Sequence, residues 1–240
     1  MRTKRALLSK STNIESNGFW LAFSISGLLL TLLLSHITDI DLVIQASLFD
    51  TASGNWLLDR DEPTLKLLFY DGIKGILVLL AVLLLALLVV DRFWPILGTL
   101  RRASTIALLS LILVPGTVGV IKATSNTPCP RDLSSFGGHL PYVDVLDSWP
   151  AGSQPAELQQ CYPAGHASGG FALLALTLMA SSLQGRAALA VMALFIGWSM
   201  GIYKMAIGDH FLSHTLVTML IGIFIISCLH RYFPKTERSL

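Results

Sequence analysis

The chain has 240 residues, of which 53% are hydrophobic and only 13% are charged, well below the roughly 25% of charged residues typical of soluble domains. Its net charge is only +2 and it has no run of basic residues, so the composition gives no sign of a nucleic-acid-binding protein. These properties predict an integral membrane protein with a single domain over residues 1–240.

Six apolar runs are long enough to cross a bilayer, because a spanning helix needs about 17 to 25 mainly apolar residues. They cover residues 19–37, 73–91, 105–121, 167–183, 187–204 and 211–229. The first run is too deep and too long for a cleaved signal peptide, so we expect it to be retained. The predicted fold class is all-α, a six-transmembrane helix bundle with a long extracytoplasmic loop between the third and fourth helices.

Basic residues are distributed unequally between the two sides of this bundle. Eleven of the seventeen lie on the side that holds both termini: Arg2, Lys4, Arg5, Lys10, Arg92, Arg101, Arg102, Arg186, Arg231, Lys235 and Arg238. By the positive-inside rule this side is cytoplasmic. The opposite ends of the helices then face the extracytoplasmic space.

Residues 38–66 connect the first two runs. They contain six acidic residues and the turn-prone stretch D-T-A-S-G-N. Two interpretations are open: a lid or interfacial helix, or a solvated connector without a chemical role.

The segment 122–165 is too long for an ordinary connection between helices, and loops of this length are usually functional or disordered. Cys129 and Cys161 bracket it. We predict a Cys129–Cys161 disulfide, because an extracytoplasmic compartment permits one. Cys228, near the cytoplasmic end of the last run, is expected to be a buried thiol.

Cations and histidines gather at the extracytoplasmic ends of four predicted helices. His166 begins the fourth helix and His210 begins the sixth, where free N–H groups and the helix dipole favour a bound anion and a neutral imidazole. Lys122, Arg131 and Lys204 fall at the same depth. Together these residues predict a site for an anion, and phosphate fits best.

Neighbouring residues complete this prediction. His214 follows His210 by one helical turn, so the two rings share a face and are expected to hydrogen-bond in line. Asp209 is the expected N-cap of the last helix. Gly165 and Gly208 allow the backbone to approach a ligand closely.

These segments resemble the type 2 phosphatidic acid phosphatase superfamily, which includes vanadium haloperoxidases. Its signature is a Lys followed by Arg-Pro, then Pro-Ser-Gly-His, then Ser-Arg with a His six positions on and an Asp four further. The chain offers K-A-T-S-N-T-P-C-P-R from Lys122, P-A-G-H up to His166, and K-M-A-I-G-D-H-F-L-S-H from Lys204. The resemblance covers about residues 105–229 and is closest to a bacterial branch of membrane lipid phosphatases with variant motifs.

The resemblance implies that His210 is a nucleophile forming a phosphohistidine and that His166 is the general acid for the leaving group. It implies that Lys122, Arg131 and Lys204 clamp the phosphate.

The chain also departs from the signature. The Lys-to-Arg spacing is two residues longer, Pro130 precedes rather than follows Arg131, and Lys204 replaces an Arg. Ala164 replaces the phosphate-binding Ser, and Ser168 is the residue that could supply the missing hydroxyl.

The replacement of the orienting Asp by His214 matters most, because a neutral imidazole stabilises a developing positive charge on His210 less than a carboxylate does. Asp209, Asp144 and Asp147 are the candidates to compensate.

The function expected from these features is a metal-independent lipid phosphatase of the bacterial inner (plasma) membrane, without a cofactor and with its active site facing the periplasm. Its partners would be membrane lipids and a phosphorylated lipid substrate: a polyprenyl diphosphate, phosphatidate, phosphatidylglycerol phosphate or a lipid A phosphate. The alternatives are phosphoryl transfer to another lipid, a zinc hydrolase using His166, His210 and His214, and a non-enzymatic transporter or accessory protein for anionic lipids. The oligomeric state is left open.

Overall fold

The computed structural model describes residues 2–233, with side chains described from residue 18 to residue 233. Its main elements are α1 (Arg2–Ile37), α2 (Ile40–Ala46), β1 (Phe49–Asp50), β2 (Asn55–Trp56), α3 (Pro63–Lys66), α4 (Gly72–Phe93), α5 (Arg101–Thr124), α6 (Ala167–Ala172), α7 (Leu183–Ala206) and α8 (Leu212–Tyr232). A π-helical turn, Leu67–Asp71, joins α3 to α4, and short 3-10 turns cover Gly98–Leu100, Pro130–Asp132 and Ser134–Phe136. Six basic side chains used for the predicted orientation lie outside the described side chains: Arg2, Lys4, Arg5, Lys10, Lys235 and Arg238.

The all-α class is confirmed, since the only strands in residues 2–233 are two residues long and pair with each other. Five helices of the described chain are long and apolar enough to cross a membrane: Gly18–Ile37, Pro63–Phe93, Gly98–Thr124, Leu183–Ala206 and Leu212–Tyr232. The protein is therefore an α-helical protein of the membrane-spanning kind. Pro115 does not interrupt α5, as is common for proline in membrane helices.

The fourth predicted run is shorter than expected. Helix is present over Ala167–Met179 instead of 167–183, as α6 followed by a 3-10 stretch, Leu173–Met179. With about 1.5 Å per α-helical residue and about 2.0 Å per 3-10 residue, this element is roughly 23 Å long. That length is below the roughly 30 Å of a bilayer core, so this helix alone does not qualify as a span.

Helix α8 is the centre of the bundle, packing against α1, α5 and α6. Small residues allow the closest approaches. A Cβ atom added at Gly170 of α6 would lie 2.6 Å from the Cα atom of Gly197 of α7, so this helix pair requires glycine there. By contrast, large apolar side chains such as Leu79 and Leu83 of α4 are exposed, as expected where a helix faces lipid.

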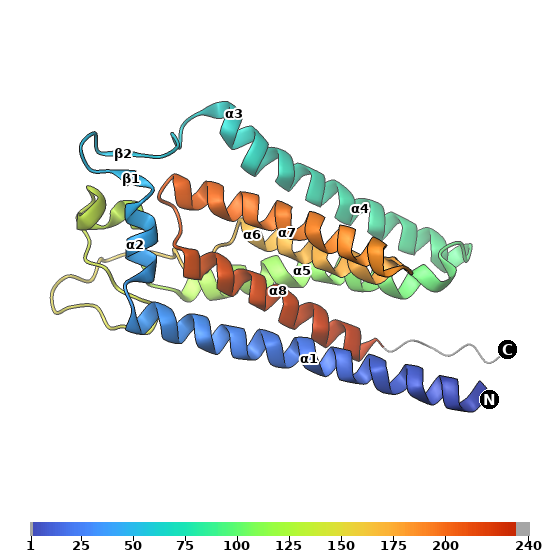
Figure 1. The fold of residues 1–240 in the computed structure, drawn as a ribbon. Coiled ribbons are helices and arrows are strands. Elements are labelled where there is room, and N and C mark those ends of the chain that lie inside the picture. Colours follow the sequence, from blue (N-terminus) through green and yellow to red (C-terminus); the bar gives the residue numbers. More distant parts are fainter. Residues whose placement is uncertain (1, 234–240) are drawn as a thin grey trace.

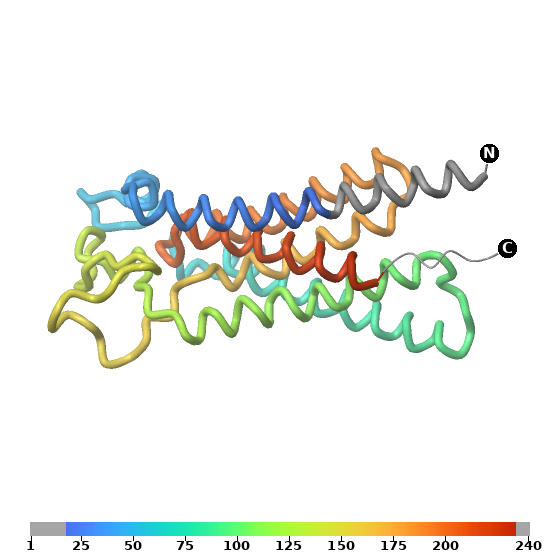
Figure 2. The backbone as a smooth tube through the Cα atoms, turned by 90° about the horizontal axis from the view of Figure 1, so that it is seen from below, coloured from blue at the N-terminus to red at the C-terminus, as the bar shows by residue number. Residues whose placement is uncertain are grey.

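The two long connecting segments, residues 38–66 and 125–166, gather at one end of the bundle (Figures 1 and 2). α1 begins and α8 ends at the other end, where the α4–α5 and α6–α7 connections also lie. The segment with α2 and the strands and the long loop after α5 therefore share one end, and the predicted site residues lie close to it.

Within the segment 38–66, helix α2 packs against the bundle, whereas residues 50–55 and 59–61 are exposed. The carboxylate of Asp41 accepts hydrogen bonds from the backbone N–H (3.0 Å) and the hydroxyl of Ser213 in the first turn of α8. The side-chain amide of Gln45 donates to the carbonyl of Met205 at 2.7 Å. These buried contacts tie α2 to the end of α7 and the start of α8, which are the two sides of the turn that holds His210.

Candidate active site

A cavity of about 370 Å³ opens at the loop end of the bundle. Its wall draws on four separate parts of the chain: the β2–α3 region, α5 with the following loop, the start of α6, and the α7–α8 turn. The lining residues are Arg60, Asp61, Lys66, Tyr70, Lys122, Cys129, Arg131, His166, Tyr203, Lys204, Ile207, Asp209 and His210. Five cations against two carboxylates make this cavity a site for an anion.

Both predicted catalytic histidines line this cavity. His166 is the N-cap residue of α6, His210 lies two residues before α8, and their ring centroids are 6.1 Å apart. Burial, reinforced by Lys204 and Lys122, lowers the pKa of His166 to about 4. Burial, with a smaller contribution from His214, also lowers the pKa of His210 well below its usual value of 6.5. Both rings are therefore neutral at neutral pH, and His210 retains the lone pair that a nucleophile needs.

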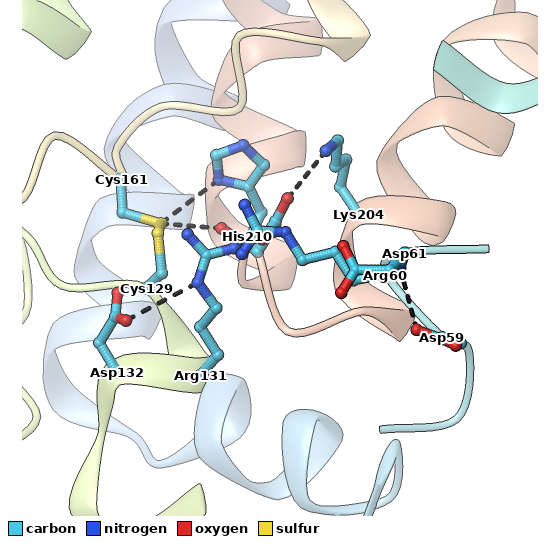
Figure 3. Close-up of polar contacts among 10 residues, drawn as sticks. Asp59, Arg60, Asp61, Cys129, Arg131, Asp132, Cys161, Lys204 and His210 are labelled. Atoms are coloured by element: carbon cyan, nitrogen blue, oxygen red, sulfur yellow. Dashed lines mark hydrogen bonds and ion pairs between the residues drawn. A yellow bond between two sulfur atoms is a disulfide. The ribbon is translucent and has the colours of Figure 1, made fainter. Parts of the chain in front are cut away.

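The three predicted phosphate-binding cations also line the cavity, but two of them form ion pairs with a carboxylate. Asp209 accepts from Lys204 Nζ at 2.8 Å and from the guanidinium of Arg131. Arg60 Nε is 4.0 Å from the same carboxylate. Figure 3 shows the Arg60 side chain extending from the segment of Asp59 and Asp61 toward His210. Asp209 thus stands where an anionic ligand would meet the cations, while Lys122 makes no such ion pair in the described part of the chain.

Arg60 and Lys66 were missed by the sequence analysis, which placed them in the connector 38–66. Their only signal in the sequence was that they are cations on the extracytoplasmic side. Because more than sixty residues separate them from Arg131, only the tertiary structure brings them to the same cavity.

The turn that holds His210 is fixed by the backbone. Gly208 has φ +75°, and a Cβ atom there would lie 2.4 Å from Trp56 Cε2, so only glycine fits. The Gly208 carbonyl accepts from the backbone N–H of Arg131 at 3.0 Å. The prediction that Asp209 caps α8 was wrong, because the N-cap residue is Phe211 and Asp41 receives the Ser213 N–H instead. The carboxylate of Asp209 is drawn to the cations of the cavity.

Two predicted phosphate-binding residues lie elsewhere. Gly165 and Ser168 line a second, mainly apolar cavity of about 430 Å³ between α4, α5 and α6. The Ser168 hydroxyl donates to the carbonyl of Gly165 at 2.5 Å, within its own helical turn. Neither residue lines the polar cavity, so the structure does not place the Ser168 hydroxyl where the missing serine of the signature was expected. Tyr70, Lys122 and His166 line both cavities, which are therefore neighbours.

His214 lies behind His210 and outside the cavity wall. Its ring centroid is 5.8 Å from that of His210, and no hydrogen bond joins the two rings in the described structure; His214 Nδ1 is buried without a partner. The expected in-line hydrogen bond is therefore absent. Asp144 and Asp147 do not replace it, because both lie beside His36, at 3.8 and 3.4 Å.

The predicted Cys129–Cys161 disulfide is present and forms part of the site. Cys129 lines the cavity, and Cys161 Sγ is 3.6 Å from Nδ1 of His210, as Figure 3 shows. A disulfide sulfur thus lies beside the imidazole of His210. The expectation for Cys228 was wrong, since its side chain is exposed on the bundle surface.

The zinc alternative required three histidines. Within the described residues, the one group of at least three candidate metal-ligand side chains with atoms within 4.8 Å of one another is Cys161, His210 and His214. His166 does not belong to it, and the sulfur of Cys161 is held in the disulfide. The ligand set that the sequence suggested is therefore not assembled.

Fold and site together define a helical membrane protein with a cationic, histidine-containing pocket at one end of the bundle. The model of the PAP2 superfamily matches residues 103–238, more than half of the chain. The chain belongs to this superfamily, and this membership indicates a phosphatase that acts on phosphoric esters. The matched region holds both histidines, Lys122, Arg131 and Lys204. Comparison with curated proteins and with solved structures gave no match.

Proposed function

We propose that this protein is a membrane lipid phosphatase that hydrolyses a lipid phosphomonoester or diphosphate through a phosphohistidine intermediate. The observation that supports this most strongly is the meeting of His166 and His210, 6.1 Å apart, at one cavity lined by Lys122, Arg131 and Lys204. A phosphoryl group between the rings has a nucleophile on one side and a proton donor on the other.

In the first step the lone pair of a His210 ring nitrogen attacks phosphorus, and the bond from phosphorus to the leaving oxygen breaks. His166, protonated in the complex with the anion, gives its proton to that oxygen. In the second step His166 accepts a proton from water, the resulting oxygen attacks the phosphohistidine, and the P–N bond breaks to release inorganic phosphate. The surrounding cations stabilise the charge on the non-bridging oxygens throughout.

The mainly apolar cavity supports a lipid as substrate. It adjoins the polar cavity at Tyr70, Lys122 and His166 and extends along α4 past Leu77 and Ala81. An acyl or prenyl chain lying there would leave its phosphate beside the two histidines.

We also propose that the site faces the periplasm of a bacterial inner membrane. Arg92, Arg101, Arg102 and Arg186 flank the helix ends opposite the site, as the positive-inside rule expects for cytoplasmic loops. The disulfide beside His210 supports an oxidising compartment on the site's side.

The test is phosphate release by the purified, detergent-solubilised protein from a panel of lipid phosphates. His210→Ala and His166→Ala should each abolish measurable turnover, while the exposed loop residue His139, changed to alanine, serves as the matched control. Full activity in either site variant would exclude the mechanism.

Two further measurements separate the alternatives. Activity that survives EDTA but is blocked by vanadate supports a metal-independent phosphohistidine route, whereas loss with EDTA supports a metalloenzyme. Label from the substrate phosphate appearing in a second lipid, instead of in inorganic phosphate, would identify a phosphotransferase.

A further inference from the structure

Lys74 is a cation that the proposed reaction at His210 does not use. It lies in the first turn of α4 and lines the mainly apolar cavity but not the polar one. Its Nζ is 5.9 Å from the centroid of the Tyr70 ring, and that ring is 4.6 Å from the ring of His166. Lys74 has no carboxylate within ion-pair distance among the described residues.

The position of His166 at both cavities indicates on which side of the transferred phosphoryl group the leaving group lies. In an in-line displacement the leaving group departs on the side opposite the nucleophile, and His166 must reach the leaving oxygen. His166 is one of the residues shared by the two cavities, whereas His210, Arg131 and Lys204 line only the polar one. The leaving group therefore lies on the side of the apolar cavity.

The charge of Lys74 acts electrostatically on His166. It is among the cations that lower the pKa of His166, after burial, Lys204 and Lys122. A cation that lines an apolar cavity and has no ion-pair partner there can bind an anionic group, and the departing part of a lipid diphosphate supplies one. A lipid monoester with a neutral alcohol as leaving group has no charge to offer there.

We propose that Lys74, beside Tyr70, forms a subsite for the phosphate that stays on the lipid, and that the substrate is accordingly a lipid diphosphate. This inference rests on the proposed phosphatase function. The terminal phosphoryl group is transferred to His210, the P–O bond to the bridging oxygen breaks, and His166 protonates that oxygen. One water is consumed in the second step, and the products are lipid monophosphate and inorganic phosphate. Lys74 stabilises the negative charge that develops on the leaving phosphate.

The test compares two substrates with the same chain, farnesyl diphosphate and farnesyl monophosphate, using the full-length purified protein. Because hydrogen bonds to charged groups are worth more than neutral ones, Lys74→Gln should lower kcat/KM for the diphosphate by roughly tenfold to a hundredfold. Its kcat/KM for the monophosphate should change by less than about threefold, and Lys74→Arg should restore most of the diphosphate activity. Arg92→Gln, the same loss of charge at the other end of α4, is the matched control.

The outcomes separate the two proposals. Equal losses on both substrates, or no loss on either, would overturn the subsite and leave Lys74 an interfacial anchor. A wild-type protein that hydrolyses only the monophosphate would also overturn the subsite, with the phosphatase function intact. If the wild type releases phosphate from neither lipid, the proposed function fails and the subsite fails with it.

Discussion

Removal of the disulfide is expected to weaken both the fold and the active site. The Cys129–Cys161 bridge closes a loop with a sequence separation of 32. In the chain-entropy model a loop of this length corresponds to about 3 to 4 kcal/mol of stability. We therefore expect the double substitution Cys129→Ser/Cys161→Ser to lower the thermal midpoint by roughly 6 to 16 °C, given about 2 to 4 °C per kcal/mol for a chain of this size.

The loss of activity should exceed the loss that unfolding of the variant explains. Cys161 Sγ is 3.6 Å from His210 Nδ1, and Cys129 lines the cavity, so the bridge also helps to hold His210, the proposed nucleophile, in place. At a temperature where the variant is folded, kcat should drop by at least about tenfold, because small displacements of a reacting group are costly.

The assay is thermal inactivation and steady-state phosphate release in detergent, with the wild type measured with and without a reductant. Cys228→Ser, which changes an exposed cysteine in α8, is the control and should behave as the wild type. An unchanged midpoint in the double variant would refute the reasoning. It would show that the aromatic cluster around Phe136 and Phe211 holds this end of the bundle without the bridge.

Two other predictions concern α2 and His166, the proposed general acid. Asp41→Ala should destabilise the protein by about 2 to 4 kcal/mol, because two buried donors of Ser213 lose their acceptor. Thermal denaturation measures this loss, with Asp39→Ala as the control. Equal thermal midpoints of the two variants would contradict the prediction. Binding of phosphate or vanadate near pH 6.5 should take up about one proton, because the anion favours the imidazolium form of His166, whose pKa is about 4 in the free protein. Titration calorimetry in buffers of different ionisation enthalpy measures the uptake, and an equal uptake by His166→Asn would assign the proton elsewhere.

Much of the fold followed from the sequence because a bilayer imposes strict local requirements. A segment that crosses lipid must be a continuous apolar helix, so the runs that contain α1, α4, α5, α7 and α8 could be recognised directly. The run beginning at residue 167 was overestimated at its end: helix stops at Met179, and its last seven residues are 3-10. The signal for this boundary was Ser182, which caps the start of α7 by accepting a hydrogen bond from the N–H of Gly185, whereas hydrophobic length alone did not show it.

The site followed from the sequence in part. His166, His210, Lys122, Arg131 and Lys204 occur at helix ends on the same side of the bundle, and the membrane forces such ends to a common depth. Contacts that depend on the direction of individual side chains could not be predicted from the sequence.

Two side chains make contacts other than those that the sequence suggested. Asp209 was expected to cap α8 and pairs with cations of the cavity instead, because Asp41 from a distant helix supplies the cap. Ser168, expected at the phosphate, points into its own helical turn.

The sequence by itself determined an α-helical membrane bundle, the superfamily and the common depth of the candidate site residues, because hydrophobic length and short motifs are local properties of the chain. Only the tertiary structure decided that Arg60 and Lys66 join the site, that a disulfide sulfur lies beside His210, and that Lys74 lines the adjoining apolar cavity. These juxtapositions join residues far apart in the chain. They depend on how the helices pack and on where side chains point, which no local pattern specifies.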